Sequence, residues 1–123
     1  MNAANHTAFG FGFTALSASF FDVNIYTVEL ATASIFFALL PDIDTPQSLI
    51  GKAVKPLSKR INRAVGHRTA THSIFYLLAI TFLASYHSFE LGLVAFFGTF
   101  SHLLGDMITR AGVQFLYPLS FSP

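Results

Sequence analysis

One pair of side chains combines histidine with aspartate inside apolar sequence. His102 and Asp106 are four residues apart in the apolar run 91–108, so on a helix both side chains lie on the same face. An imidazole nitrogen and a carboxylate oxygen placed in this way can bind one metal ion or bridge two. An unpaired ionisable group in hydrocarbon costs about 2.5–3.5 kcal/mol, which favours a ligand role over chance. The alternative is that the two groups only pair with each other.

A second candidate pair, His67 and His72, lies in the stretch Gly66-His67-Arg68-Thr69-Ala70-Thr71-His72-Ser73. On a continuous helix the two histidines would diverge by about 140°. They can face one point only if His67 lies in a loop and a helix begins near Thr69 or Thr71, both of which suit an N-cap. The alternative is one exposed histidine and one interfacial histidine.

Two carboxylates, Asp42 and Asp44, stand between Pro41 and Pro46. In an extended segment they would point the same way, as paired or bridging ligands need. The alternative is a turn at the end of a helix. Either aspartate is also a candidate general base. His6 is the remaining candidate ligand, and its alternative is a solvated side chain near the N-terminus.

The composition indicates a membrane protein of one domain, residues 1–123. Hydrophobic residues make up 53% of the chain and charged residues only 11%, whereas soluble domains carry about 25% charged residues. A net charge of +1 argues against nucleic-acid binding by bulk charge. The absence of cysteine excludes thiolate catalysis and sulfur-ligated zinc.

Four apolar runs predict an all-α, membrane-embedded bundle of about four helices. They are shorter than the roughly 20 residues that a spanning helix wants. Polar flanks must therefore be drawn in, the bilayer must thin, or the bundle must be only partly embedded. The runs are residues 6–21, 25–40, 73–86 and 91–108.

A basic amphipathic segment, residues 47–65, connects the second and third runs. Apolar residues recur there at spacings of three and four, with lysines and arginines between them. This pattern predicts a segment, broken or kinked at Pro56, that lies in the headgroup region with its basic side chains toward anionic lipid. The alternative is a solvated basic loop.

The basic residues also predict a sidedness. Six of the seven lie between 52 and 68, which places this connection in the cytoplasm. With four crossings, all the candidate ligands then fall at the cytoplasmic end of the bundle. Glu29 would lie about 20 Å from Asp42 along a helix, while Asp22, His87 and Glu90 fall at the opposite end. The candidate ligands are His6, Asp42, Asp44, His67, His72, His102 and Asp106.

Nitrogen and oxygen ligands without sulfur suit Zn²⁺ first, and also Mn²⁺, Fe²⁺ or Ni²⁺. Seven candidates exceed the three ligands that a catalytic zinc usually takes from protein, so one or two ions fit. Two ions together can stabilise both oxygens of an in-line displacement at phosphorus. Arg68 and Arg110 are candidates to hold the phosphate. Contact with lipid headgroups is the alternative for both arginines.

At these motifs the sequence resembles the YdjM-like family of bacterial inner-membrane proteins, which are described as metal-dependent hydrolases. The resemblance rests on Leu39-Leu40-Pro41-Asp42-Ile43-Asp44, Gly66-His67-Arg68, Thr71-His72-Ser73, Ser101-His102-Leu103-Leu104, Asp106, Ala111-Gly112-Val113 and Tyr117-Pro118. It implies ligand roles for all seven candidate residues.

The leading hypothesis is a multi-pass protein of the bacterial inner membrane with a metal site that faces the cytoplasm. It would hydrolyse a phosphoester, with a lipid among the candidate substrates, through a metal-activated water. The alternative is a non-enzymatic membrane protein that binds or transports metal ions or protons. A transporter should carry ionisable groups along the depth of the bilayer, whereas here they cluster at one end, and only Glu29 lies elsewhere.

Overall fold

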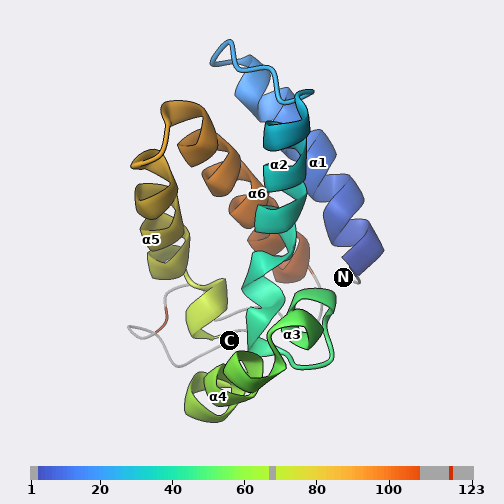
Figure 1. Cartoon of the computed structure of the whole chain (residues 1–123), viewed down its shortest axis with the longest axis vertical. Coiled ribbons are helices and arrows are strands. Elements are labelled where there is room, and N and C mark those ends of the chain that lie inside the picture. Colours follow the sequence, from blue (N-terminus) through green and yellow to red (C-terminus); the bar gives the residue numbers. More distant parts are fainter. Residues whose placement is uncertain (1–2, 67–68, 109–116, 118–123) are drawn as a thin grey trace.

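The computed structural model describes residues 3–66, 69–108 and 117, and every regular element within them is helical (Figure 1). This confirms the predicted all-α class. The predicted count of about four helices is not confirmed, because the basic connection contributes two further α-helices and two segments are 3₁₀ helices. The elements are α1 (Ala3–Ser19), α2 (Val28–Leu39), η1 (Leu40–Asp44), α3 (Leu49–Ala53), α4 (Lys55–Val65), η2 (Ala70–His72), α5 (Ile74–Ser85) and α6 (Phe89–Met107).

Helix α6 is the centre of the bundle and packs against α1, α2 and α5, while α1 also packs against α2 (Figure 1). Small residues allow these helices to approach closely. A Cβ added at Gly10 of α1 would meet Ala38 of α2, and one added at Gly98 of α6 would lie 3.0 Å from Phe37 Cβ. The end of α2 and the last turns of α6 are therefore held side by side.

None of the helices in the described residues combines the length and the apolar character needed to cross a membrane. The predicted spanning helices are therefore not found. The α-helices are shorter than the apolar runs of the sequence. In the second run, α2 begins after Thr27, which caps it by accepting from Leu30 N, and the 3₁₀ helix η1 begins at Leu40. With 12 residues each, α2 and α5 extend about 18 Å, against about 30 Å of hydrocarbon.

The start of α5 differs from the sequence prediction. Ser73, whose hydroxyl accepts from Tyr76 N, caps this helix. The predicted capping by Thr69 or Thr71 is wrong, because the chain forms the short helix η2 before α5 begins. Thr71 lies within η2, and its hydroxyl donates to Asp44 Oδ2 at 2.6 Å.

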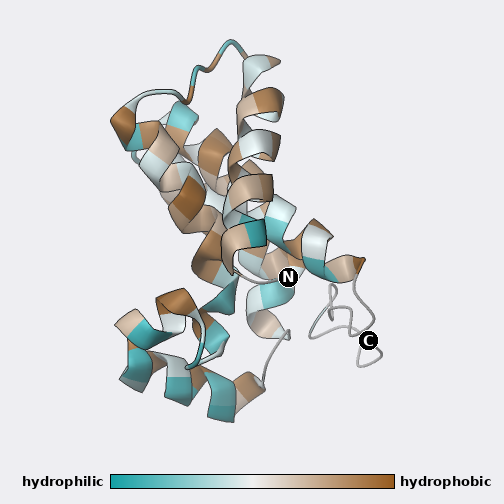
Figure 2. Cartoon of the chain, turned by 90° about the vertical axis from the view of Figure 1, so that its right-hand side faces the viewer, coloured by the Kyte–Doolittle hydropathy of each residue, from teal (hydrophilic) through white to brown (hydrophobic). Residues whose placement is uncertain are grey.

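The basic connection folds into two helices, α3 and α4, which we call the basic hairpin (residues 49–65). The break falls at Val54, and Pro56 lies in the first turn of α4, where its missing N–H leaves no hydrogen bond unmade. The predicted break at Pro56 is thus a helix start. Figure 2 shows hydrophilic residues gathered in this hairpin, while the bundle is mostly hydrophobic.

Candidate metal centre

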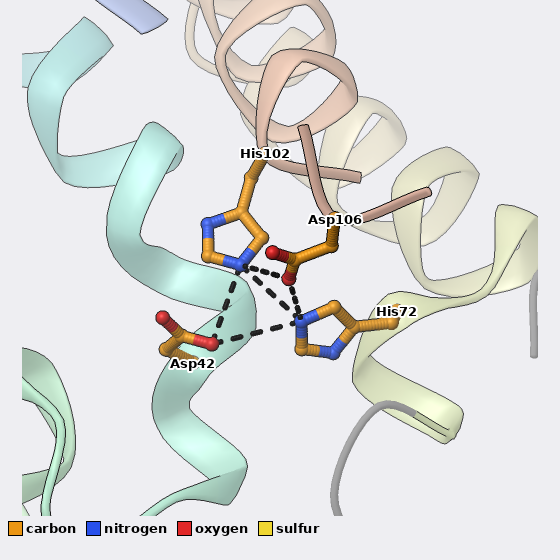
Figure 3. A group of neighbouring side chains, drawn as sticks. All are labelled: Asp42, His72, His102 and Asp106. Atoms are coloured by element: carbon orange, nitrogen blue, oxygen red, sulfur yellow. Dashed lines mark hydrogen bonds and ion pairs between the residues drawn. The ribbon is translucent and has the colours of Figure 1, made fainter. Parts of the chain in front are cut away.

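Four side chains from three separate segments meet at one end of the bundle (Figure 3). Asp42 comes from η1, His72 from η2, and His102 and Asp106 from the last two turns of α6. Each offers one donor atom, and the four atoms lie within 4.8 Å of one another. Three of the side chains are at most 1% exposed, whereas Asp42 is 19% exposed.

The donor atoms of the centre lie close together. His72 Nε2 lies 3.2 Å from His102 Nε2, 3.2 Å from Asp106 Oδ2 and 3.6 Å from Asp42 Oδ1. His102 Nε2 lies 3.2 Å from Asp106 Oδ2 and 3.3 Å from Asp42 Oδ1. A tetrahedral zinc site with bonds of about 2.0–2.1 Å has ligand separations of about 3.3–3.4 Å. These five separations are therefore close to those around a four-coordinate ion.

A backbone contact sets the orientation of His102. Its Nδ1 lies 2.6 Å from the carbonyl oxygen of Ala38. With the proton on Nδ1 donated to that oxygen, Nε2 is left with its lone pair toward the centre. Metal-binding histidines commonly use their second nitrogen in this way.

A carboxylate lies behind His72. Its Nδ1 is 3.4 Å from Asp44 Oδ2 and 3.2 Å from the Thr71 hydroxyl. Thr71 donates to the same Asp44 oxygen, and Thr45 donates to Asp44 Oδ1 at 3.0 Å. Asp44 is fully buried, so it is placed to orient the imidazole rather than to face the centre.

The sequence had predicted that Asp42 and Asp44 point the same way in an extended segment. In the structure they do not. They belong to the 3₁₀ helix η1, in which residues two apart point about 120° away from each other. They therefore reach opposite nitrogens of His72: Asp42 Oδ1 is near Nε2, and Asp44 Oδ2 is near Nδ1. Only Asp42 joins the four-residue group.

His6 lies next to this group. Its ring stacks on His102 with 3.6 Å between centroids and 8° between planes, and its Nε2 is 3.3 Å from Asp106 Oδ1. It is 1% exposed, so the solvated alternative for His6 does not hold. Neither ring nitrogen has hydrogen-bond geometry to a partner within the described part of the chain. Asp106 thus presents one oxygen to His6 and the other to His72 and His102.

Contacts between histidines and aspartates dominate the pKa values of His72 and Asp42. Burial lowers the pKa of His72, but contacts with Asp106, Asp42 and Asp44 outweigh burial and raise this pKa to about 10. Burial raises the pKa of Asp42, but hydrogen bonds from His102 and His72 hold it below its usual range. A divalent ion bound here would replace the proton of His72.

Three predicted site residues, His67, Arg68 and Arg110, lie outside the described residues, and their roles stay predictions. At the opposite end of the bundle, Glu29 Oε1 lies 3.7 Å from His87 Nε2. This pair is far along the helices from the centre, as the spacing of Glu29 from Asp42 had indicated.

Sequence reasoning missed the groups that hold the carboxylates and imidazoles in place. They are the Ala38 carbonyl and the side chains of Ser48, Asn62 and Thr71. Ser48 donates to the Asp42 carbonyl oxygen at 2.7 Å, and Asn62 donates to the Asp44 carbonyl oxygen at 2.9 Å. Residue spacing cannot indicate which backbone carbonyl accepts a hydrogen bond. Asn62 was missed because it lies in the basic segment, which was interpreted from its lysines and arginines.

Comparison with known proteins decides the family. A family model described as "YdjM inner membrane protein" matches residues 1–122. The chain belongs to the YdjM family. The resemblance seen in the sequence motifs is thereby confirmed, and the inner membrane is the location that this family's name gives.

Proteins of two bacteria are similar to the chain. The "Inner membrane protein YdjM" of Escherichia coli (strain K12) is 42% identical over 99 residues, which cover 73% of this chain and 50% of the relative. The "Uncharacterized protein YvsG" of Bacillus subtilis (strain 168) is 33% identical over 109 residues, 87% of this chain and 68% of the relative. The chain spans about half the length of the YdjM relatives that it matches. No solved structure matches it.

Proposed function

We propose that this YdjM-family chain is a single domain, residues 1–123, that binds a divalent ion and hydrolyses a phosphoester at the inner membrane. The observation that carries the proposal is the group Asp42, His72, His102 and Asp106, whose donor atoms all lie within 4.8 Å of one another. The buried partners behind both histidines strengthen it, because they leave Nε2 of each ring directed at the centre.

The donor set favours Zn²⁺, with Mn²⁺, Fe²⁺ or Ni²⁺ as further candidates. Four protein ligands fill a tetrahedral zinc, and a hydrolase needs one open position. Five-coordinate zinc or a six-coordinate ion provides it. A water or substrate would approach such an ion past Asp42, whose side chain is the most exposed of the four. His6 and Asp106 Oδ1 are the candidate ligands of a second ion.

When bound, the ion supplies Lewis acidity and activates a water for attack at phosphorus. The chain's own residues then have separate tasks. Asp42 reaches the histidines through Oδ1 (Figure 3), and its other oxygen is our candidate general base. Asp44 holds His72 in place, and Arg68 and Arg110 hold the phosphate.

The membrane side of the proposal rests on exposed apolar side chains. They occur on α1 and the turn after it, on α2 and on α5, and such surfaces mark contact with lipid or protein. We propose that they contact the hydrocarbon, that the basic hairpin meets anionic headgroups on the cytoplasmic face, and that a lipid phosphoester is the substrate. The side chains are Leu16, Phe20, Phe36, Phe75, Leu78, Phe82 and Leu83.

The second candidate function is binding or transport of metal ions or protons without hydrolysis. The closed four-ligand arrangement favours it, since structural sites are typically filled by protein ligands. Against transport, the ionisable side chains of the described residues gather at the two ends of the bundle rather than along its length.

The deciding experiment measures metal content and turnover together. Protein purified in lipid nanodiscs is analysed by mass spectrometry for metal, and the same samples are screened with phosphodiester and phospholipid substrates. We expect stoichiometric metal in the wild type and in the control His87→Ala, which alters an exposed histidine at the opposite end. His102→Ala and Asp42→Ala should lose it.

Absence of stoichiometric metal from the wild type would refute the centre. Bound metal without turnover, combined with ion flux in liposomes, would favour the second function.

A further inference from the structure

The basic hairpin is attached to the segment that carries Asp42 and Asp44. Ser48, the residue that caps α3, donates to the Asp42 carbonyl oxygen at 2.7 Å. Asn62 of α4 donates to the Asp44 carbonyl oxygen at 2.9 Å. At Gly51 a Cβ would collide with the carbonyl oxygen of Thr45, so the backbone of α3 lies directly on the end of η1. Any shift of the hairpin must therefore move the backbone beneath both carboxylates.

Helix α4 joins this attachment through Asn62. Asn62 lies one turn after Ser58, which is fully buried. Ile61 and Val65, on the same side of the helix as Ser58, are partly covered. Leu57 lies about 100° around the helix from Ser58, and its side chain is 49% exposed. The fold therefore leaves this apolar side chain of the amphipathic helix uncovered.

The exposed face of the hairpin combines apolar and positive side chains. Leu49 of α3 is 62% exposed, and Val54, at the break between the helices, is 38% exposed. Both add to the apolar surface that Leu57 presents. The sequence has no acidic residue between positions 45 and 65. A surface that is both apolar and strongly basic complements an anionic lipid layer. The basic residues are Lys52, Lys55, Lys59, Arg60 and Arg63.

We infer that the hairpin couples the metal centre to the lipid surface: anionic lipid bound to its outer face tightens metal binding through the contacts of Ser48 and Asn62 with η1. This inference rests on the proposed metal centre. A hairpin held by lipid restricts the backbone at Asp42 and Asp44, so the ion loses less freedom in ordering its ligands. Because such coupling is reciprocal, the ion must tighten the hold of the hairpin on lipid by the same factor.

The first measurement compares Zn²⁺ affinity in two membranes. The full chain is reconstituted in nanodiscs of phosphatidylcholine alone or with phosphatidylglycerol, and the Kd for Zn²⁺ is measured by competition with a chelating dye. Coupling between two sites is typically 5-fold or more, so we expect about 5-fold tighter binding in the anionic discs. Asn62→Ala should abolish this difference, and Asn24→Ala, an asparagine at the other end of the bundle, should retain it.

The second measurement follows the hairpin itself. The chain has no cysteine, so Leu57→Cys carries an environment-sensitive fluorophore at one position. We expect a blue shift in anionic discs that grows when Zn²⁺ is added. The triple variant Lys59→Gln, Arg60→Gln and Arg63→Gln should lose the blue shift and the lipid effect on Zn²⁺ together. It also keeps the test valid if Asn62→Ala misfolds.

The outcomes separate the inference from the proposed function. Equal Zn²⁺ affinity in the two membranes, with the fluorophore reporting insertion, overturns the coupling and leaves the centre intact. An unchanged fluorophore in anionic discs overturns the lipid surface. Failure of the wild type to bind Zn²⁺ in either membrane overturns the centre and the inference with it.

Discussion

Replacing Asp44 with asparagine separates two roles for this carboxylate. As an orienting partner, Asp44 acts only through the Nδ1 side of His72, from which its Oδ2 is 3.4 Å away. Loss of such a partner typically weakens metal binding 10–100-fold, which corresponds to about 1.4–2.8 kcal/mol. Asparagine keeps the shape and one acceptor oxygen, so the fold should survive.

The measurement is the Kd for Zn²⁺ by chelator competition, together with metal content after dialysis. We expect Asp44→Asn to keep one Zn²⁺ per chain with 10–100-fold weaker affinity, whereas Asp42→Asn loses stoichiometric metal. Asp22→Asn is the matched control, because Asp22 lies at the far end of the bundle with φ 58°, a conformation that asparagine readily adopts.

Two results would refute this reasoning. If Asp44→Asn loses metal as completely as Asp42→Asn, Asp44 is itself a ligand, as the sequence predicted. If it changes the Kd by less than about 3-fold, the contact behind His72 does not orient the ring.

Three further predictions follow from the packing and charges. In the metal-free protein the raised pKa of His72 stabilises the fold. This contribution is complete below about pH 6.5 and is lost as pH rises toward 10. The Tm measured in chelator should therefore fall over this range, and His72→Gln should reduce the dependence of Tm on pH. Ser73→Ala removes the cap of α5 and should lower the free energy of unfolding by about 1 kcal/mol in denaturant titrations. In Gly10→Ala the added methyl group meets helix α2 and should destabilise the protein by about 1–3 kcal/mol. In Gly12→Ala the methyl group has open space around it and should stabilise the protein by about 0.5–1 kcal/mol. Equal thermal unfolding of the two variants would contradict this packing.

The sequence predicted which end of the bundle carries the candidate ligands, because helical rise and the positions of the apolar runs determine depth. The i, i+4 spacing of His102 and Asp106 was enough to place both on one face of α6. The sequence could not show whether Asp42 and Asp44 lie in an extended segment or in a 3₁₀ helix, because Pro41 is compatible with both. That difference decides whether Asp44 faces the centre or lies behind His72.

Helix boundaries were harder to predict than helix positions. Ser73 and Thr71 are both good N-caps, and only the structure shows that the Ser73 hydroxyl accepts from Tyr76 N and caps α5. The lengths of the apolar runs overestimated the helices for a similar reason, because hydrophobicity continues through Leu40 into η1 although the α-helix ends there. The exposure of Leu57 on α4 also required the structure, since periodicity alone does not tell which side of a helix meets the fold.

The three segments that meet at the centre lie about thirty residues apart in the chain, at 42, 72 and 102–106. An ion held by all of them would close two long loops at once, and such clips stabilise most when the loops they close are long. Moreover, neither η1 nor η2 can complete the ligand set until α6 has been made and has packed beside them. Ion capture would therefore follow the synthesis and packing of α6 and would report that this helix has reached its place.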